Sequence, residues 1–287
     1  MNKKIVLILS ACAIILSSCK AQTTSNETYF DIVRPLFTGD KAFETTAYVE
    51  QFWRVPGNTG FNNSIYRIIE NLEAAGYVNE DKANNQQRFV YRLEKRPMDE
   101  LTWEPVDAEL SIVGMSEPLL KFETNRNMIY QYASSTPDEG VVAEVIHIES
   151  LNDFKTKDVS GKIIFSEMSP YRLYDAAIIQ GKALGMMTYN NPDYLQPKKN
   201  VTSIQFRSMR YKEGLNAWGI ALSYQAKEIL KNELNKGKVK TKVFIKTNIY
   251  SSEELTVVAS IKGIDLANES LVFSAHVQEP GANDNAT

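Results

Sequence analysis

The sequence predicts an α/β protein in which a mixed sheet with flanking helices is interrupted by a smaller α/β insert. Three observations predict this class. Apolar strand patterns lie on either side of the middle of the chain, at Arg88–Glu94 and Glu254–Ile261. The interval of about 150 residues between them is too long for a loop in a compact domain. That interval also carries its own alternation of strand and helix patterns, which is typical of an α/β domain.

The composition is that of an ordinary globular protein. Of the 287 residues, 43% are hydrophobic and 23% are charged, which leaves room for one large or two small domains. The formal net charge is −3. Since nucleic-acid binding needs a basic surface, we expect no nucleic-acid partner.

The first 19 residues have the features of a secretory signal. Two lysines precede an apolar run, Ile5–Leu16, that is too short to span a membrane. The sequence Leu-Ser-Ser-Cys that ends at Cys19 resembles the bacterial lipobox, so we expect Cys19 to be lipidated and to anchor the protein to a bacterial membrane. Lys20, by resemblance to known sorting signals, favours the outer membrane of a Gram-negative cell. Cys12 leaves with the signal, so no disulfide is expected in the mature chain.

Two helices are expected before the first of these strands. Lys41–Trp53 has a partial apolar face and is ended by the turn Arg54–Asn58. Asn62–Ala75 places apolar side chains at i, i+3, i+4 and i+7, and a glycine follows as a C-terminal stop. The polar stretch Asn79–Gln87 is expected to be the loop that leads into the strand.

The interval between the two outer strands contains the pattern of a small α/β domain. A last strand, Val239–Ile249, is expected to return the chain toward the outer sheet. Before it, we expect strands within 141–148, 158–165, 185–190 and 220–224, and helices at 172–184 and 225–234.

The C-terminal stretch carries the candidate site. An apolar strand over Ser270–Ala275 is expected to deliver His276 to its end, and a Pro-Gly turn then leads to Gly-Ala-Asn-Asp-Asn-Ala-Thr at 281–287. Asn and Asp are preferred helix caps, so Asn283–Thr287 predicts the start of a helix. Because a helix of one turn gains little stability, we expect the chain to be the N-terminal part of a longer protein.

These residues resemble the hallmark of the co-catalytic zinc aminopeptidase family, which includes bacterial zinc aminopeptidases and glutamate carboxypeptidase-like enzymes. The family has His-x-Asp at the end of a strand, followed by an Asp inside a Gly-Ala-(Asn/Asp)-Asp-Asn-Ala-(Ser/Thr) segment. The resemblance implies that His276 binds one zinc ion and that Asp284 bridges two. Gln278 stands where the family has Asp. Gln278 or its neighbour Glu279 is therefore the candidate for orienting the His276 ring by a hydrogen bond.

The resemblance also implies a fold and a domain order. The fold is a three-layer mixed-sheet zinc exopeptidase core, incomplete in this chain. Its insert resembles the protease-associated domain, in which a Gly-Lys-Ile-Ile strand is followed by a helix and a second apolar strand. The implied domains are a lipoprotein signal at 1–19, the N-terminal part of the peptidase domain at 20–103, the protease-associated insert at 104–249, and the start of the catalytic core at 250–287.

The function implied is that of a zinc-dependent exopeptidase, an aminopeptidase that hydrolyses N-terminal peptide bonds. We expect this chain to be inactive by itself, because a catalytic zinc needs about three protein ligands. One alternative is a non-catalytic scaffold similar to the transferrin-receptor ectodomain, which Gln278 favours. A glutaminyl cyclase-like acyl transferase is another, although the size of the insert argues against it. His147 is expected to be a surface or edge histidine of a strand and not a ligand.

Overall fold

The computed structural model describes residues 25–266 and 268–281. These residues fall into two compact units, with the boundary in the chain between Thr45 and Thr46. Cys12, Cys19 and Asp284 lie outside the described residues, as does the whole predicted helix start at 283–287. Within the described ranges, no helix is long and apolar enough to cross a membrane.

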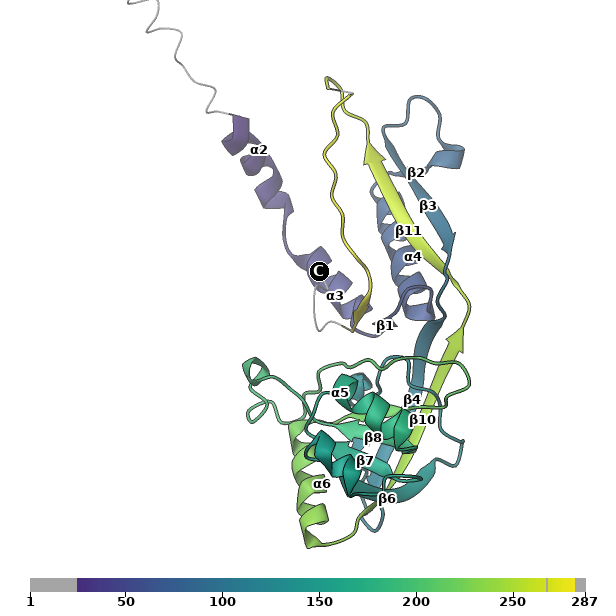
Figure 1. The fold of residues 1–287 in the computed structure, drawn as a ribbon. Coiled ribbons are helices and arrows are strands. Elements are labelled where there is room, and N and C mark those ends of the chain that lie inside the picture. Colours follow the sequence, from purple (N-terminus) through teal and green to yellow (C-terminus); the bar gives the residue numbers. More distant parts are fainter. Residues whose placement is uncertain (1–24, 267, 282–287) are drawn as a thin grey trace, which may run out of the picture. The chain divides into compact units, whose positions relative to one another are not determined.

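The N-terminal unit is helical. It contains α2 (Ser25–Val33), the short helix η1 (Arg34–Leu36) and the first part of α3 (Asp40–Val49), drawn in purple in Figure 1. The predicted helix Lys41–Trp53 is wrong at its C-terminal end. The chain leaves the helix after Val49 because Trp53 enters a strand.

The second unit contains a mixed sheet of seven strands in the order β5-β4-β10-β6-β7-β8-β9. The pairs from β5 to β6 are antiparallel, and those from β6 to β9 are parallel. A large mixed sheet with several helices confirms the predicted α/β class. The strands are β4 (Thr102–Ile112), β5 (Leu120–Lys121), β6 (Val141–His147), β7 (Ile163–Ser166), β8 (Gly185–Thr188), β9 (Gly219–Ala221) and β10 (Lys240–Tyr250).

Two helical segments pack on this sheet. Helix α6 (Tyr224–Lys236) begins where the Ser223 side chain accepts a hydrogen bond from the amide of Ala226 at 3.1 Å, which is a typical N-cap. The other segment joins α5 (Pro170–Tyr174) to the wide helix η5 (Asp175–Gln180), so the predicted helix at 172–184 ends early. It ends at Gly181, where an added Cβ would lie 2.6 Å from the side chain of Val159.

A second, three-stranded sheet consists of β2 (Val78–Asn79), β3 (Phe89–Pro97) and β11 (Glu253–Ile261). Helix α4 (Thr59–Ala74) packs on it through a small buried cluster of Phe61, Ile65 and Leu255. The predicted loop 79–87 contains a turn of 3-10 helix, η2 (Glu80–Lys82). Periodicity therefore predicted α4, β3 and β11 to within a few residues.

Two continuous chain segments run from one sheet into the other. After β3 the chain passes through residues 98–101 into β4, and after β10 it passes through 251–252 into β11. Both β4–β10 and β3–β11 are antiparallel pairs (Figure 1). The main core lies around the seven-stranded sheet and contains Trp103, Leu110, Phe165, Met186 and Met187, all fully buried.

The predicted strand Ser270–Ala275 is wrong. These residues follow β11 without belonging to a strand, and Leu271, Val272 and Phe273 are 84%, 80% and 87% exposed. A strand is stable only with a paired neighbour and a covered apolar face. No other strand in the described part of the chain pairs with this stretch. Ordered pairing resumes only at β12 (Glu279–Pro280).

Candidate metal site

The candidate site rests on a two-stranded ladder that joins distant parts of the second unit. Strand β1 (Trp53–Arg54) pairs with β12, with Arg54 opposite Glu279 and Trp53 opposite Pro280. The amide of Gly281 also donates a hydrogen bond of 2.7 Å to the carbonyl of Phe52. The ladder therefore fixes the backbone at residues 279–281, shortly after His276.

His276 lies beside a carboxylate. Its Nε2 is 2.9 Å from Oε1 of Glu279, and the imidazole is 59% exposed while the Glu279 side chain is 12% exposed. No described residue forms a hydrogen bond with the other ring nitrogen, Nδ1. A carboxylate on one nitrogen of a histidine ring fixes its tautomer and orientation and increases the basicity of the other nitrogen. Gln278, the other predicted partner of the ring, forms no such bond within the described residues.

Arg54 is the buried cation of this region, with only 2% of the residue exposed. Its Nε donates to the carbonyl of Val277 at 2.7 Å, and its Nη1 donates to the carbonyls of Val49 at 2.6 Å and Gly281 at 2.8 Å. Burial lowers the pKa of Arg54, whereas the nearby negative charge of Glu279 raises it. A buried charge is tolerated only with such partners.

A cavity of about 340 Å³ opens next to His276. The loop that contains His276 forms one side of this cavity. Aromatic and polar side chains form the other side, including Phe206 and Gln131 from within residues 104–249. The Phe206 ring stands edge-on to the Trp53 ring, with a centroid distance of 6.2 Å. The Trp53 and Trp103 rings are also edge-on, with their centroids 5.3 Å apart. The lining residues are Trp53, Arg54, Val55, Gln131, Phe206, His276, Gln278, Glu279 and Pro280.

The residues present fit part of a zinc site. An imidazole with one free nitrogen is a zinc donor, and Glu279 occupies the position of a ring-orienting carboxylate. Asp284, the second predicted ligand, lies outside the described residues. Among the residues that are described, no three His, Cys, Asp or Glu side chains come together closely enough to hold a metal ion.

The sequence did not single out Arg54, Gln131 or Phe206. The available signal for Arg54 is a charged residue between two large apolar ones, Trp53 and Val55. That pattern indicates a buried cation but not its partners. Phe206 and Gln131 lie in irregular segments, where periodicity gives no information about side-chain direction.

His147 lies elsewhere in the second unit. It ends β6, its ring stacks on Phe165 with a centroid distance of 4.9 Å, and burial lowers its pKa. It lines a different cavity from the one that His276 lines. The two histidines are therefore not brought together in one site.

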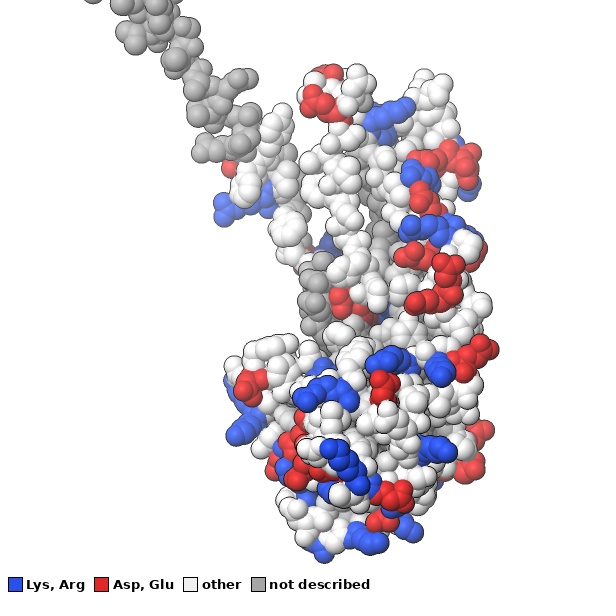
Figure 2. All heavy atoms as spheres, in the orientation of Figure 1, with Lys and Arg blue, Asp and Glu red and all other residues white. Residues whose placement is uncertain are grey.

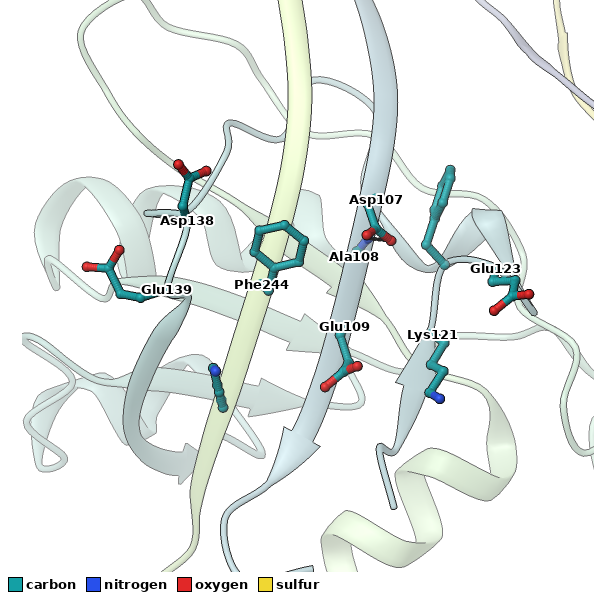
Figure 3. Close-up of a pocket in the computed structure, with 10 residues that line it drawn as sticks. Asp107, Ala108, Glu109, Lys121, Glu123, Asp138, Glu139 and Phe244 are labelled. Carbon is teal, nitrogen blue, oxygen red and sulfur yellow. Dashed lines mark hydrogen bonds between the residues drawn. The ribbon is translucent and has the colours of Figure 1, made fainter. Parts of the chain in front are cut away.

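The outer face of the seven-stranded sheet carries a second, acidic hollow of about 400 Å³. Asp107 and Glu109 lie on β4, Lys121 lies on β5, and Phe244 of β10 is the strand neighbour of Glu109 (Figure 3). Basic and acidic side chains are interspersed on the face of the protein drawn in Figure 2. The remaining labelled carboxylates of the hollow are Glu123, Asp138 and Glu139.

The comparisons with known proteins concern the fold. No family model matches the chain, and no curated protein matches it. Among solved structures, the chain is similar to an aminopeptidase from Aneurinibacillus sp. strain AM-1, with 18% identity, a TM-score of 0.50, and coverage of 86% of this chain and 55% of that one. It is similar to a peptidase M28 precursor from Shewanella amazonensis SB2B, with 16% identity, a TM-score of 0.54, and coverage of 91% and 61%. A zinc aminopeptidase from Bacillus subtilis has 16% identity, a TM-score of 0.48, and coverage of 85% and 54%.

These identities establish likeness of fold alone. The chain spans 55% and 61% of the length of the first two structures. The protein therefore has a mixed α/β fold like that of the first two structures, over 55% and 61% of their length.

Proposed function

We propose that this chain is part of a zinc-dependent exopeptidase, an aminopeptidase that hydrolyses N-terminal peptide bonds. The observation that carries the proposal is the 2.9 Å contact between His276 and Glu279 at the edge of a cavity. The peptidase-like fold supports it. In this proposal His276 and Asp284 would be the residues of this chain that hold zinc. Zinc bound there would polarise the scissile carbonyl and activate water for its hydrolysis.

The other residues of the site orient the His276 ring and contact the substrate. Glu279 holds the His276 ring in one tautomer, so that the free nitrogen points away from the carboxylate. Trp53 and Phe206 give the cavity an apolar wall, which favours contact with an apolar substrate side chain. Since Phe206 and Gln131 come from within residues 104–249, the segment proposed as a protease-associated insert shapes access to the site.

We propose that the 287-residue chain has no peptidase activity by itself. A catalytic zinc uses about three protein ligands, whereas the recognised motif supplies His276 and Asp284. A general base is also needed to take a proton from water, and none is assigned in this chain. Hydrolysis of amino-acid anilides by the purified chain, abolished by His276→Ala, would overturn this part of the proposal.

The cellular location is proposed from the sequence. Lipidation of Cys19 would anchor the protein to a bacterial membrane, and Lys20 favours the outer membrane. A peptidase anchored in this way would act on peptides outside the inner membrane.

Zinc binding tests the proposed function. The full chain and two variants, His276→Ala and His147→Ala, would be dialysed against zinc and their metal content measured. These are the two histidines of the chain, so His147→Ala is a matched control. The proposal expects wild-type protein and His147→Ala to retain zinc and His276→Ala to lose it. Equal zinc content in all three proteins would contradict it.

A non-catalytic scaffold is the second candidate, favoured by Gln278 at the position of the family Asp. A neutral amide increases the basicity of a ligand histidine less than a carboxylate does. If neither wild type nor any variant retains zinc, the scaffold becomes the better account.

A further inference from the structure

We propose that the N-terminal helical unit docks on a lipid surface through the apolar face of α2, next to the acyl chains proposed for Cys19. The inference rests on the cellular location proposed above and extends it to a described segment of the chain. Three observations support it. The helix has an exposed apolar face, it has no packing among the described residues, and it begins six positions after Cys19.

The apolar face of α2 is continuous. Apolar residues recur at i, i+3, i+4 and i+7, the spacing that places side chains on one face of a helix. These residues are Tyr29, Ile32, Val33 and Leu36. Asp31 lies on the other face, because residues two apart on a helix do not point the same way. Helix α2 and the short helix η1 that follows it are therefore amphipathic (Figure 1).

No part of the described chain covers this face. Every described side chain from residue 29 to residue 40 is exposed, and the large apolar ones from Tyr29 to Phe37 are between 59% and 80% exposed. Helix α2 has nine residues. A helix of that length is marginal in water, since most helical stability in proteins comes from packing of the apolar face. It therefore needs an apolar partner that the described residues do not supply.

The position of Cys19 favours a lipid surface as this partner. The helix begins at Ser25, and a fully extended chain of six residues spans at most about 20 Å. Acyl chains on Cys19 would therefore hold α2 within that distance of the lipid. Tyr29, Phe30 and Phe37 supply aromatic rings, which favour the boundary between lipid and water. An amphipathic helix of this kind lies in the plane of that boundary and does not cross it.

The helix and the acyl chains have different tasks in this proposal. Stable anchoring takes more than one signal, and a short amphipathic helix alone binds lipid reversibly. The acyl chains of Cys19 therefore remain necessary for a stable anchor. Helix α2 adds a second contact, which fixes residues 29–37 against the lipid surface.

The test places one thiol on either face of α2 in the full chain. The natural cysteines are Cys12, which leaves with the signal, and Cys19, whose sulfur is acylated in this proposal. An added cysteine can therefore be labelled alone. Val33→Cys lies on the apolar face, and Asp31→Cys is the matched control on the other face. Both residues are exposed, so neither change removes a buried contact. Each protein is labelled with a fluorophore and reconstituted into phosphatidylcholine vesicles.

Quenching of the fluorophore shows what surrounds each label. Nitroxide groups on the acyl chains of the lipid quench a label in lipid, and iodide quenches a label in water. We expect nitroxide lipid to quench the label at Val33 and iodide to quench the label at Asp31. Equal quenching of the two labels by either agent would overturn the inference. A label at Val33 that neither agent reaches would also overturn it, because protein then covers the face, either a second copy or another part of this protein.

A second measurement needs no variant. Amide hydrogen exchange of the wild-type chain is compared with and without phosphatidylcholine vesicles. Docking stabilises α2, so the amides of residues 29–33 should exchange more slowly when vesicles are present. The amides of α6, in the second unit, should not change. Unchanged exchange at residues 29–33 in protein that is bound to vesicles would contradict the inference.

Mass spectrometry of the N-terminal peptide separates this inference from the proposed location. If Cys19 is acylated and the label at Val33 stays in water, the location stands and the inference is wrong. If Cys19 carries no acyl chain, the proposed anchor is wrong. The exchange measurement with added vesicles then decides whether α2 docks on lipid.

Discussion

Glu279 and His276 contact each other in the candidate site, with 2.9 Å between the carboxylate Oε1 and the imidazole Nε2. The carboxylate is nearly buried and the ring is largely exposed, so the ring presents its other nitrogen away from Glu279. The carboxylate that contacts the ring is therefore one position after Gln278, which itself forms no bond to the ring within the described residues.

Replacement of this carboxylate gives the first prediction. Glu279→Gln keeps the size of the side chain but replaces the charged hydrogen-bond partner of the ring with a neutral amide, so zinc affinity is expected to fall by about 10- to 100-fold. Gln278→Ala, at the adjacent position, should leave affinity unchanged. Chelator competition checks both variants. A larger loss in Gln278→Ala than in Glu279→Gln would show that the orienting partner has been assigned to the wrong residue.

The second prediction concerns packing of the seven-stranded sheet. A Cβ added at Gly185 would lie 2.3 Å from the indole of Trp218, which is buried. Gly185→Ala is therefore expected to lower the free energy of unfolding by about 1–3 kcal/mol, the usual cost of overpacking. In Gly263→Ala the nearest atom is the Leu266 carbonyl oxygen at 4.0 Å, so its stability should stay close to wild type. Urea titration measures both, and equal stabilities would contradict the packing described.

The third prediction is a pH dependence. Lys157 lies 2.8 Å from the Asp153 carboxylate, which also accepts bonds from the Glu149 amide at 3.0 Å and the Ser150 hydroxyl at 3.0 Å. The bond from Lys157, followed by the other two, holds the pKa of Asp153 well below its usual range. Because the pKa is lower in the folded state, this contribution to stability is full above the unfolded value of about 3.9 and is lost as the pH falls below it.

Acid titration checks this expectation. Wild type should be more stable than Asp153→Asn at pH 7, and the difference should shrink as the pH falls below about 4. A difference that stays constant down to pH 2 would contradict the assigned cause.

The fourth prediction concerns the proposed anchor. Cys19→Ser, expressed in a Gram-negative cell, is expected to move the protein from the membrane fraction to the soluble fraction, because no acyl chain can be attached. Cys12→Ser is the matched control, since this cysteine lies inside the signal, and it should stay with the membranes. Immunoblots of the two fractions give the answer, and membrane retention of Cys19→Ser would contradict lipidation at that residue.

The sequence predicted elements with strong local patterns. Helix α4 and strands β3, β6 and β11 follow from periodicity alone, because each covers a buried face with a regular spacing of apolar residues. Strand β4 was missed, although Ala108, Leu110 and Ile112 alternate as buried residues. Pro105 and the polar residues around it interrupt the alternating pattern in the first half of that strand. The ladder also has a bulge there, opposite Lys246 and Thr247.

Features that depend on distant parts of the chain could not be predicted. The ladder between Arg54 and Glu279 is two residues long on each side and has no periodic pattern. The apolar run Leu271–Phe273 has a strand pattern but is exposed, because a pattern predicts a strand only where a neighbouring strand is present. Motif resemblance pointed to His276 and Glu279, whereas Arg54, which holds their backbone, became visible only from its hydrogen bonds.

The central claim is that His276 is a zinc ligand, and anomalous diffraction at the zinc absorption edge tests it most directly. Crystals of the full chain grown with zinc should show an anomalous peak within bonding distance of the His276 ring, about 2.0–2.1 Å from the nitrogen that Glu279 leaves free. A carboxylate oxygen of Asp284 should lie at the same peak. Zinc bound elsewhere, with no peak at His276 in crystals in which Glu279 still contacts the ring, would contradict the account.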